Sequence, residues 1–441
     1  MTPLGIKNEQ QLLSLAAALG ASSVPDLSSE EKKLLRNATP MRGAPLVRRA
    51  RTLIGIGQDP LGDAFCEVRS PTVRRSNGAT YTPRKIIRAM VEWAARNGSP
   101  ARVVDPGAGS GRFLIAAGRK FPHSQLVGIE IDPVAAILLR ANLSATGLAS
   151  RTRIVVDDYR NVSLDFCSGQ TLFVGNPPYV RHHSISKHWK EWLVDQANAR
   201  SQKASQLAGL HIHFFLQTLA QAEPGDYGAF ITAAEWLDVN YGALLRNLFL
   251  AELGGQAIHV IEPKAAPFPD ATTTAAITCF RVGTKPATVL VRRVHTCNNL
   301  GDLTKGRKVH RDQLGASSRW TQFTRIARRA PEGFVELGEL CRVHRGQVTG
   351  ANKVWIAGPR ADGLPASVLF SAVTRARELI EAGDTLDDTS GLRNVIDLPA
   401  DLDTFDGQER IAIDRFLTWA KLMGADMTYI ARSRSAWWSV G

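Results

Sequence analysis

The chain has 441 residues, of which 44% are hydrophobic and 22% charged, a composition typical of folded globular proteins. This length predicts about two or three domains, and no apolar run approaches the ~18 residues of a membrane-spanning helix. The net charge of +13 indicates a polyanionic partner. The 5 cysteines form no C-x-x-C pair, which disfavours a disulfide framework or a zinc site and is typical of a cytoplasmic protein.

Residues 1–75 are predicted to form a basic helical region. Residues 10–19 have apolar side chains at helical spacing, and residues 28–36 begin with serines and acids and end with bases. The first residues lack the basic and apolar segments of a secretory signal. No catalytic motif is present, so we expect a scaffold.

Residues 76–284 alternate predicted strands with predicted helices. The predicted strands are 102–105, 126–130, 153–157, 171–175, 228–233, 257–261 and 275–282. This pattern predicts an α/β domain with a seven-stranded, mostly parallel, Rossmann-like sheet and helices on both faces. No helix separates the last two strands, so one of them is expected to run antiparallel.

Within this domain, the first strand leads into a turn with a glycine at every second position. The turn consists of Asp105, Pro106, Gly107, Ala108, Gly109, Ser110 and Gly111. Such glycines let the backbone pass close under a ligand. The dinucleotide fingerprint places its third glycine one residue later. An acid two residues ahead of the glycines would repel a pyrophosphate but attract the amino group of a methionine moiety.

Two more acids follow the next two strands. Glu130 ends the second strand, where it can accept hydrogen bonds from ribose hydroxyls. Asp158 and Tyr159 follow the third, where a carboxylate can accept from an adenine amine while a ring covers its face. Each acid alone could be a solvated loop carboxylate. Together with the glycine turn, they favour S-adenosylmethionine over NAD as the cofactor.

The fourth strand ends at a double proline, because proline cannot continue a strand ladder. Asn176, Pro177, Pro178 and Tyr179 present an amide, a carbonyl and an aromatic face there. Beside a sulfonium methyl donor, Asn176 and the Pro177 carbonyl could hold an exocyclic amine and draw it towards tetrahedral geometry. Tyr179 would stack on the base. The alternative is a proline-rich turn followed by a surface tyrosine.

An acceptor base in a duplex must be flipped out to reach such a site, and it needs a second wall. Phe268, in a proline-rich loop, could provide this wall or could equally be a core residue. Thr82 precedes a predicted helix at 84–95, whose N-terminus favours a carboxylate. His211 and His213 lie two apart on a predicted helix, so we expect no metal site.

After residue 284 the alternation stops, and residues 285–441 are predicted to form a separate, basic α+β domain. Between Arg281 and Ala330, twelve Lys or Arg residues are opposed only by Asp302 and Asp312, a balance of +10. Such a block indicates nucleic acid binding. The candidates for DNA-backbone contacts are Arg181, Arg292, Arg293, Lys305, Arg307 and Lys308.

The order of these motifs resembles the gamma-class adenine-N6 DNA methyltransferases of bacterial restriction–modification systems, which are class I S-adenosylmethionine-dependent enzymes. The resemblance covers roughly residues 78–282 and is looser over 337–352. The motifs that carry it are 80–83, 105–111, Glu130, 158–159, 176–179, 224–231 with Trp236, and 268–269.

The resemblance implies a site-specific, adenine-specific DNA methyltransferase with S-adenosyl-L-methionine as cofactor and no metal. The implied cofactor residues are Tyr81, Thr82, Asp105, Pro106, Gly107, Gly109, Gly111, Glu130, Ile131, Asp158, Tyr159 and Asn176. The implied catalytic residues are Asn176, Pro177, Pro178 and Tyr179, with Tyr179 and Phe268 stacking on the target adenine.

The resemblance also implies double-stranded DNA as partner, and we consider a cognate restriction endonuclease as a further one. We expect a cytoplasmic, nucleoid-associated monomer. Residues 285–441 would be the target-recognition domain, and because Trp437 and Trp438 so near the end look poorly protected, we expect it to be abbreviated.

Three alternatives stay open at this point. An RNA methyltransferase would share the chemistry. A protein-glutamine methyltransferase also uses Asn-Pro-Pro-Tyr, but those chains are shorter and lack a long basic C-terminal domain. A non-catalytic DNA-binding subunit would not need intact Asp105, Glu130, Asn176 and Tyr179.

Overall fold

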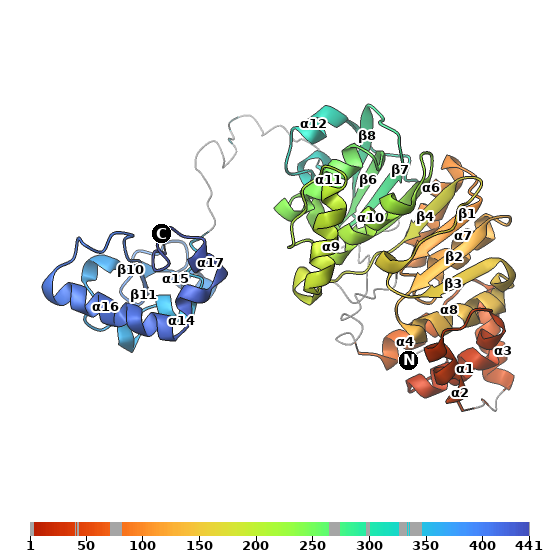
Figure 1. Ribbon diagram of the computed structural model, residues 1–441, viewed down its shortest axis with the longest axis horizontal. Helices are drawn as coiled ribbons and strands as arrows, with labels where there is room; N and C mark the ends of the chain where they lie inside the picture. The colour runs from red at the N-terminus through yellow and green to blue at the C-terminus, as the bar shows by residue number, and fades with distance from the viewer. Residues whose placement is uncertain are drawn as a thin grey trace. The chain divides into compact units, whose positions relative to one another are not determined.

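The computed structural model describes residues 4–39, 41, 44–70, 82–263, 274–296, 300–325, 333, 335 and 346–440. The chain forms two compact units, Met1–Ala327 and Arg328–Gly441 (Figure 1). In the described part of the chain, no helix is long and apolar enough to cross a membrane.

The first unit is built on a nine-stranded sheet with the order β3-β2-β1-β4-β5-β7-β6-β8-β9. Strand β7 pairs antiparallel with both β5 and β6, which confirms the expected antiparallel strand. The strands are β1 Arg102–Pro106, β2 Gln125–Glu130, β3 Thr152–Val156, β4 Thr171–Gly175, β5 Tyr227–Ala233, β6 Gly255–Ile261, β7 Ala275–Arg281, β8 Thr288–Val294 and β9 Arg307–His310.

The sheet has two strands more than expected, and the predicted domain boundary at 284 is wrong. Strand β8 pairs parallel with β6, and β9 pairs antiparallel with β8, so the first unit continues to Ala327. Strand β8 was not predicted because the segment is rich in basic residues, although its alternate residues Val289 and Val291 are buried. Arg292 and Arg293, which were predicted to contact DNA, lie in this strand between the buried Val291 and Val294.

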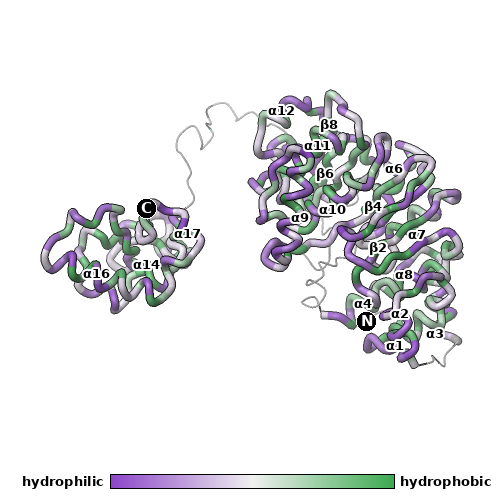
Figure 2. Tube along the Cα trace, viewed as in Figure 1, coloured by the Kyte–Doolittle hydropathy of each residue, from purple (hydrophilic) through white to green (hydrophobic). Residues whose placement is uncertain are grey.

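Two apolar layers cover the two faces of the sheet. Because successive strand residues point to opposite faces, Val103 packs in one layer and Val104 in the other. Figure 2 shows hydropathy along the same trace. The helices are α1 Glu9–Ala18, α2 Ser29–Arg36, α3 Ala44–Gly55, α4 Pro60–Val68, α6 Arg84–Asn97, α7 Arg112–Lys120, α8 Pro133–Thr146, α9 Lys187–Asn198, α10 Leu210–Gln221, α11 Ala243–Leu250 and α12 Arg311–Gly315.

Helix α8 joins the sheet to the N-terminal helices. Leu139 packs in the sheet layer, whereas Leu138 packs with α1, α3 and α4 in a third cluster. Arg140 on α8 forms a fully buried ion pair with Glu31, with 2.6 Å between Nε and Oε1. Helices α1–α4 are therefore part of the first unit and not an appended region.

The second unit is a small α+β fold with its own core. Strands β10 Leu369–Ala372 and β11 Arg393–Ile396 pair antiparallel, and the helices are α14 Asn352–Trp355, α15 Ala376–Ala382, α16 Gly407–Leu422 and α17 Tyr429–Arg432. Trp437 packs 6.1 Å from Trp355, between ring centroids, and Trp438 donates to the Pro399 carbonyl. The expectation that these tryptophans are poorly protected is therefore wrong.

Candidate active site

A cavity of about 380 Å³ lies at the carboxyl ends of β1, β2, β3 and β4. Its lining includes nine of the predicted site residues, namely Thr82, Gly107, Gly109, Glu130, Ile131, Asp158, Tyr159, Asn176 and Pro178. Asp105, Pro106, Gly111, Pro177 and Tyr179 are not part of the lining. Tyr81 and Phe268 lie outside the described residues.

The glycine turn adopts a backbone that few other residues could follow. Gly107, Gly109 and Gly111 have φ of 85°, 55° and 93°, in the left-handed region. A Cβ at Gly107 would lie 3.7 Å from Pro178 Cδ, so the turn passes directly beside the Asn-Pro-Pro-Tyr segment. Residues 107–110 of the turn thus form one wall of the cavity, and Asn176 and Pro178 form the adjoining wall.

Glu130 is buried at the end of β2 and holds the glycine turn. Its Oε2 accepts from the Gly109 amide at 2.7 Å, and its Oε1 accepts from the Asp132 amide at 2.9 Å. Burial raises the pKa of Glu130, although these amides oppose the shift. Each oxygen keeps a further lone pair with which to accept from a ligand hydroxyl.

Asp105 is 1% exposed, and neither carboxylate oxygen has a partner at hydrogen-bonding geometry among the described residues. Burial, and then the charge of Glu130, raise the pKa of Asp105 well above its ordinary value, while the Leu114 amide opposes the shift. Such a buried, incompletely satisfied carboxyl is costly for folding, which is typical of a site that a ligand completes.

Asp158 is held by Arg160, whose Nε donates to Oδ1 at 2.9 Å. Burial raises its pKa, but the hydrogen bonds from Arg160 outweigh this effect and lower it. The Arg160 guanidinium lies 3.8 Å from the ring centroid of Trp189, which also lines the cavity. Tyr159 is 2% exposed, and its hydroxyl lies 3.1 Å from Thr218 Oγ1.

The acceptor segment divides between the cavity and the core. Asn176 and Pro178 line the cavity, whereas Pro177 is buried and the half-buried Tyr179 ring packs against the apolar layer that contains Val103. Burial raises the pKa of Tyr179 well above its ordinary value, so the phenol stays protonated. A stacking role for Tyr179 remains a prediction.

The N-terminal helices contribute cavity residues that the sequence did not indicate. Phe65 on α4 and Arg69 just after it line the cavity. Arg69 forms ion pairs with Glu9, at 2.7 Å, and with Asp132. The segment carries no motif, and its only signal is that it precedes Thr82 in the chain. The predicted scaffold region therefore also supplies part of the cavity lining.

His211 and His213 are both buried on α10. Burial lowers the pKa of His211 to about 4 and that of His213 to about 3, so both are neutral near pH 7. The His213 ring stacks on Trp192 at 5.8 Å between centroids. These contacts are those of packed histidines, and the absence of a metal site stays a prediction.

The predicted DNA-backbone residues fall into two groups. Arg181, Lys305, Arg307 and Lys308 are exposed. Arg292 and Arg293 are half-buried: the first donates to the Leu300 carbonyl at 2.7 Å, and the second pairs with Glu262 at 2.8 Å. The latter two therefore serve the fold.

Comparisons with known proteins agree with this geometry. The N-6 DNA Methylase family matches residues 58–237. The chain is similar to the type II methyltransferase M.XamI of Xanthomonas campestris pv. amaranthicola, with 52% identity over 99% of this chain and 83% of that protein. A tRNA1(Val) (adenine(37)-N6)-methyltransferase of Porphyromonas gingivalis is 34% identical over 20% of this chain and 37% of its own length.

Among solved structures, the type IIG restriction endonuclease BpuSI matches with a TM-score of 0.51 and 13% identity, over 95% of this chain and 58% of that chain. At this identity the match concerns the fold alone. Since the identity to M.XamI extends over almost the whole chain, the chain belongs to the N-6 DNA methylase family, among the type II methyltransferases of restriction–modification systems.

Proposed function

We propose that this protein transfers a methyl group from S-adenosyl-L-methionine to the N6 amine of an adenine flipped out of duplex DNA. One observation carries the proposal. Asn176, the residue suited to hold an amine, lines the same cavity as Gly107, Gly109 and Glu130, the residues suited to hold the cofactor. An acceptor and a donor bound there would be neighbours.

The residues present fit S-adenosylmethionine. Thr82 Oγ1 is buried without a partner among the described residues, as are both oxygens of Asp105. These two residues would hold the methionine end, Glu130 the ribose and Asp158 the adenine. When bound, the cofactor supplies an electrophilic methyl group on a sulfonium.

The chain's own contribution to the reaction is orientation and a set of fixed dipoles. The side-chain oxygen of Asn176 and the carbonyl of Pro177 would accept from the two hydrogens of the adenine amine. These acceptors draw the nitrogen towards tetrahedral geometry and free its lone pair for attack. The turn residue Gly107, packed beside Pro178, sets the distance between the two walls. Stacking by Tyr179 and Phe268 belongs to the same proposal.

Exposed basic residues and the second unit would bind the DNA that carries the target adenine. Arg181, Lys305, Arg307 and Lys308 would contact phosphates, and residues 328–441 would recognise the target sequence. We further propose that the protein acts as a cytoplasmic monomer on nucleoid DNA and protects sites from a cognate endonuclease.

The test is incubation with tritiated S-adenosylmethionine and either duplex DNA, RNA or protein. We expect label in DNA as N6-methyladenine, and we expect Asn176→Ala to lower kcat by about 10²–10³. Asn198→Ala, at an exposed asparagine on α9, is the matched control and should leave the rate unchanged. Label found only in RNA or protein, or as a methylated cytosine in DNA, would contradict the proposal.

A further inference from the structure

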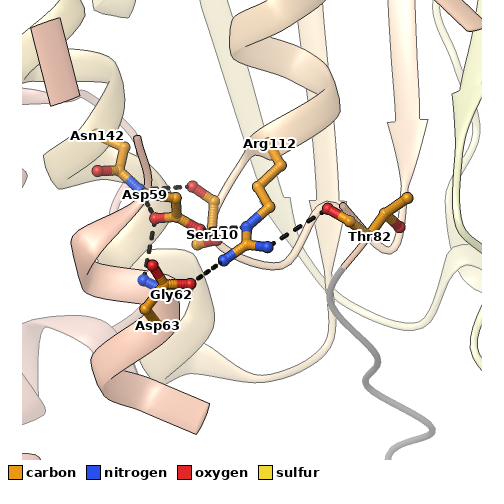
Figure 3. Close-up of polar contacts among 7 residues, drawn as sticks. All are labelled: Asp59, Gly62, Asp63, Thr82, Ser110, Arg112 and Asn142. Carbon is orange, nitrogen blue, oxygen red and sulfur yellow. Dashed lines mark hydrogen bonds and ion pairs between the residues drawn. The ribbon is translucent and has the colours of Figure 1, made fainter. Parts of the chain in front are cut away.

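In the N-terminal region, the carboxylate of Asp59 contacts the glycine turn through the side chain of Ser110 (Figure 3). Its Oδ2 accepts from Ser110 Oγ at 2.5 Å and from Arg112 Nε at 2.7 Å. Its Oδ1 accepts from Asn142 Nδ2 and from the Gly62 amide, both at 3.0 Å. The side chain is 12% exposed. All four hydrogen bonds are therefore shielded from solvent, and the one from Arg112 joins two charged groups.

This contact requires a glycine on α4. A Cβ at Gly62 would lie 2.0 Å from Asp59 Oδ2 and 2.6 Å from Ser110 Oγ. Gly62 has no positive φ, so its backbone alone would accept alanine. The missing side chain provides the space in which Asp59 meets Ser110, although glycine inside a helix costs roughly 1 kcal/mol relative to alanine.

The carboxylate holds two walls of the cavity. Ser110 lies between Gly109 and Gly111, and its carbonyl accepts from Asn142 Nδ2 at 2.9 Å, so both its side chain and its backbone are held. Ser110 and Gly109 line the cavity. On the other side, Arg112 relays the contact, because its Nη1 donates to the Thr82 carbonyl at 3.4 Å.

We propose that Asp59 is a positioning residue for cofactor binding, through which the N-terminal helices fix the glycine turn and Thr82. This inference rests on the proposed function of the cavity. A turn with three glycines is intrinsically mobile, and a ligand that must order it loses affinity. Asp59 removes that cost beforehand. Glu130 holds the adjacent Gly109 amide, so the turn is fixed from two sides.

Asp59→Asn tests the proposal, with Asp63→Asn as the matched control. An asparagine has a single acceptor oxygen, so it cannot satisfy the donors on both sides of residue 59. Asp63 lies on α4, the helix that Asp59 caps, and it pairs with the same arginine at 2.6 Å, but its side chain is 53% exposed and its ion pair is with Arg112 rather than with Ser110 of the turn. The two variants therefore lose the same charge but not the same contact.

The readouts are the Kd of S-adenosylmethionine and of S-adenosylhomocysteine by calorimetry, without DNA, and hydrogen exchange of the ligand-free protein. We expect Asp59→Asn to raise both Kd values about 10-fold and to speed exchange at residues 105–114, with α1 unchanged. The KM for S-adenosylmethionine should rise while the KM for DNA is kept. Asp63→Asn should stay within about twofold of wild type.

Ser110→Ala and the double variant complete the experiment. If Asp59 acts through the turn, the two losses of affinity are less than additive. Should Asp59→Asn fail to fold, Ser110→Ala carries the test alone, and it should weaken binding with an unchanged Tm. An unchanged Kd in the folded variant would overturn the inference, as would an equal effect of Asp63→Asn. A wild-type protein that binds neither ligand would instead overturn the proposed function of the cavity.

Discussion

The carboxylate of Asp105 lies against the backbone of Gly175, where a Cβ would come within 2.5 Å of Oδ1. Asp105 is the last residue but one of β1, and Gly175 is the last residue of the neighbouring parallel strand β4. Gly175 directly precedes Asn176, so the buried acid of the proposed cofactor site packs against the residue just before the proposed acceptor site. This contact gives a structural reason why the two sites should respond to the same substitutions.

Gly175→Ala is expected to damage both sites. The added methyl group would displace Asp105 or the end of β4, and such overpacking costs about 1–3 kcal/mol of unfolding free energy. Urea unfolding would measure the loss, and calorimetry would show weaker binding of S-adenosylmethionine. Gly55→Ala is the control, since a Cβ there has no atom within 4 Å and should leave stability unchanged or raised.

Asp105→Asn should stabilise the ligand-free protein as it weakens the site. Because the folded pKa of Asp105 is raised above the value of 3.8 for an exposed aspartate, the folded state holds the proton longer than the unfolded state. The stability of the wild type therefore falls as pH rises from the unfolded pKa of 3.8 to the raised folded pKa, whereas asparagine does not titrate. Urea unfolding at a series of pH values above 3.8 should show the gap between variant and wild type widening as pH rises. A variant that is less stable throughout would contradict the shift.

Breaking the buried ion pair between α2 and α8 should be among the most damaging single changes. Arg140 and Glu31 have fully buried side chains, and Arg140 Nη2 also donates to the Asp26 carbonyl. Glu31→Ala leaves a buried guanidinium without its counter-ion, which costs about 3–5 kcal/mol. The double change Glu31→Leu with Arg140→Met should recover most of this loss. Equal losses for the single and double variants would contradict the explanation.

The buried histidine of β6 should make the protein sensitive to acid. His259 is fully buried and its Nε2 lies 3.0 Å from the Leu303 carbonyl oxygen, while burial lowers its pKa from 6.5 to about 3. Since the unfolded state binds the proton first, stability falls as pH drops below 6.5, by up to about 1.4 kcal/mol per pH unit. His259→Gln should flatten this slope, and His123→Gln, at an exposed position, should not.

DNA affinity should depend on the exposed lysines that precede and begin β9. Lys305→Glu and Lys308→Glu should weaken binding and reduce the slope of log affinity against log salt by about 1 for each lost phosphate contact. Lys32→Glu on α2, also exposed, carries the same charge change and serves as the control. Equal slopes for all variants would show that the lysines do not meet phosphate. Arg292 and Arg293 are unsuitable for this test because their internal bonds serve the fold.

The sequence alone determined the features that depend on local backbone constraints. Alternating apolar runs predicted strands β1 to β7, the three spaced glycines predicted the tight turn, and the double proline marked the end of β4. Acids at strand ends could be placed near one another because the carboxyl ends of parallel strands meet at one edge of a sheet. The family resemblance rested on the order of these local signals.

Only the tertiary structure decided which distant residues complete the cavity. Phe65 and Arg69 line the cavity, and Asp59 holds its glycine turn through Ser110 without lining it. None of the three carries a periodicity or motif, and they reach the site because α8 is apolar on two sides and packs α1–α4 against the sheet. The positive charge of residues 281–330 likewise could not show which arginines face solvent, because a guanidinium can satisfy buried carbonyls as readily as phosphates. Side-chain partners depend on packing between segments far apart in the chain, and composition does not encode that packing.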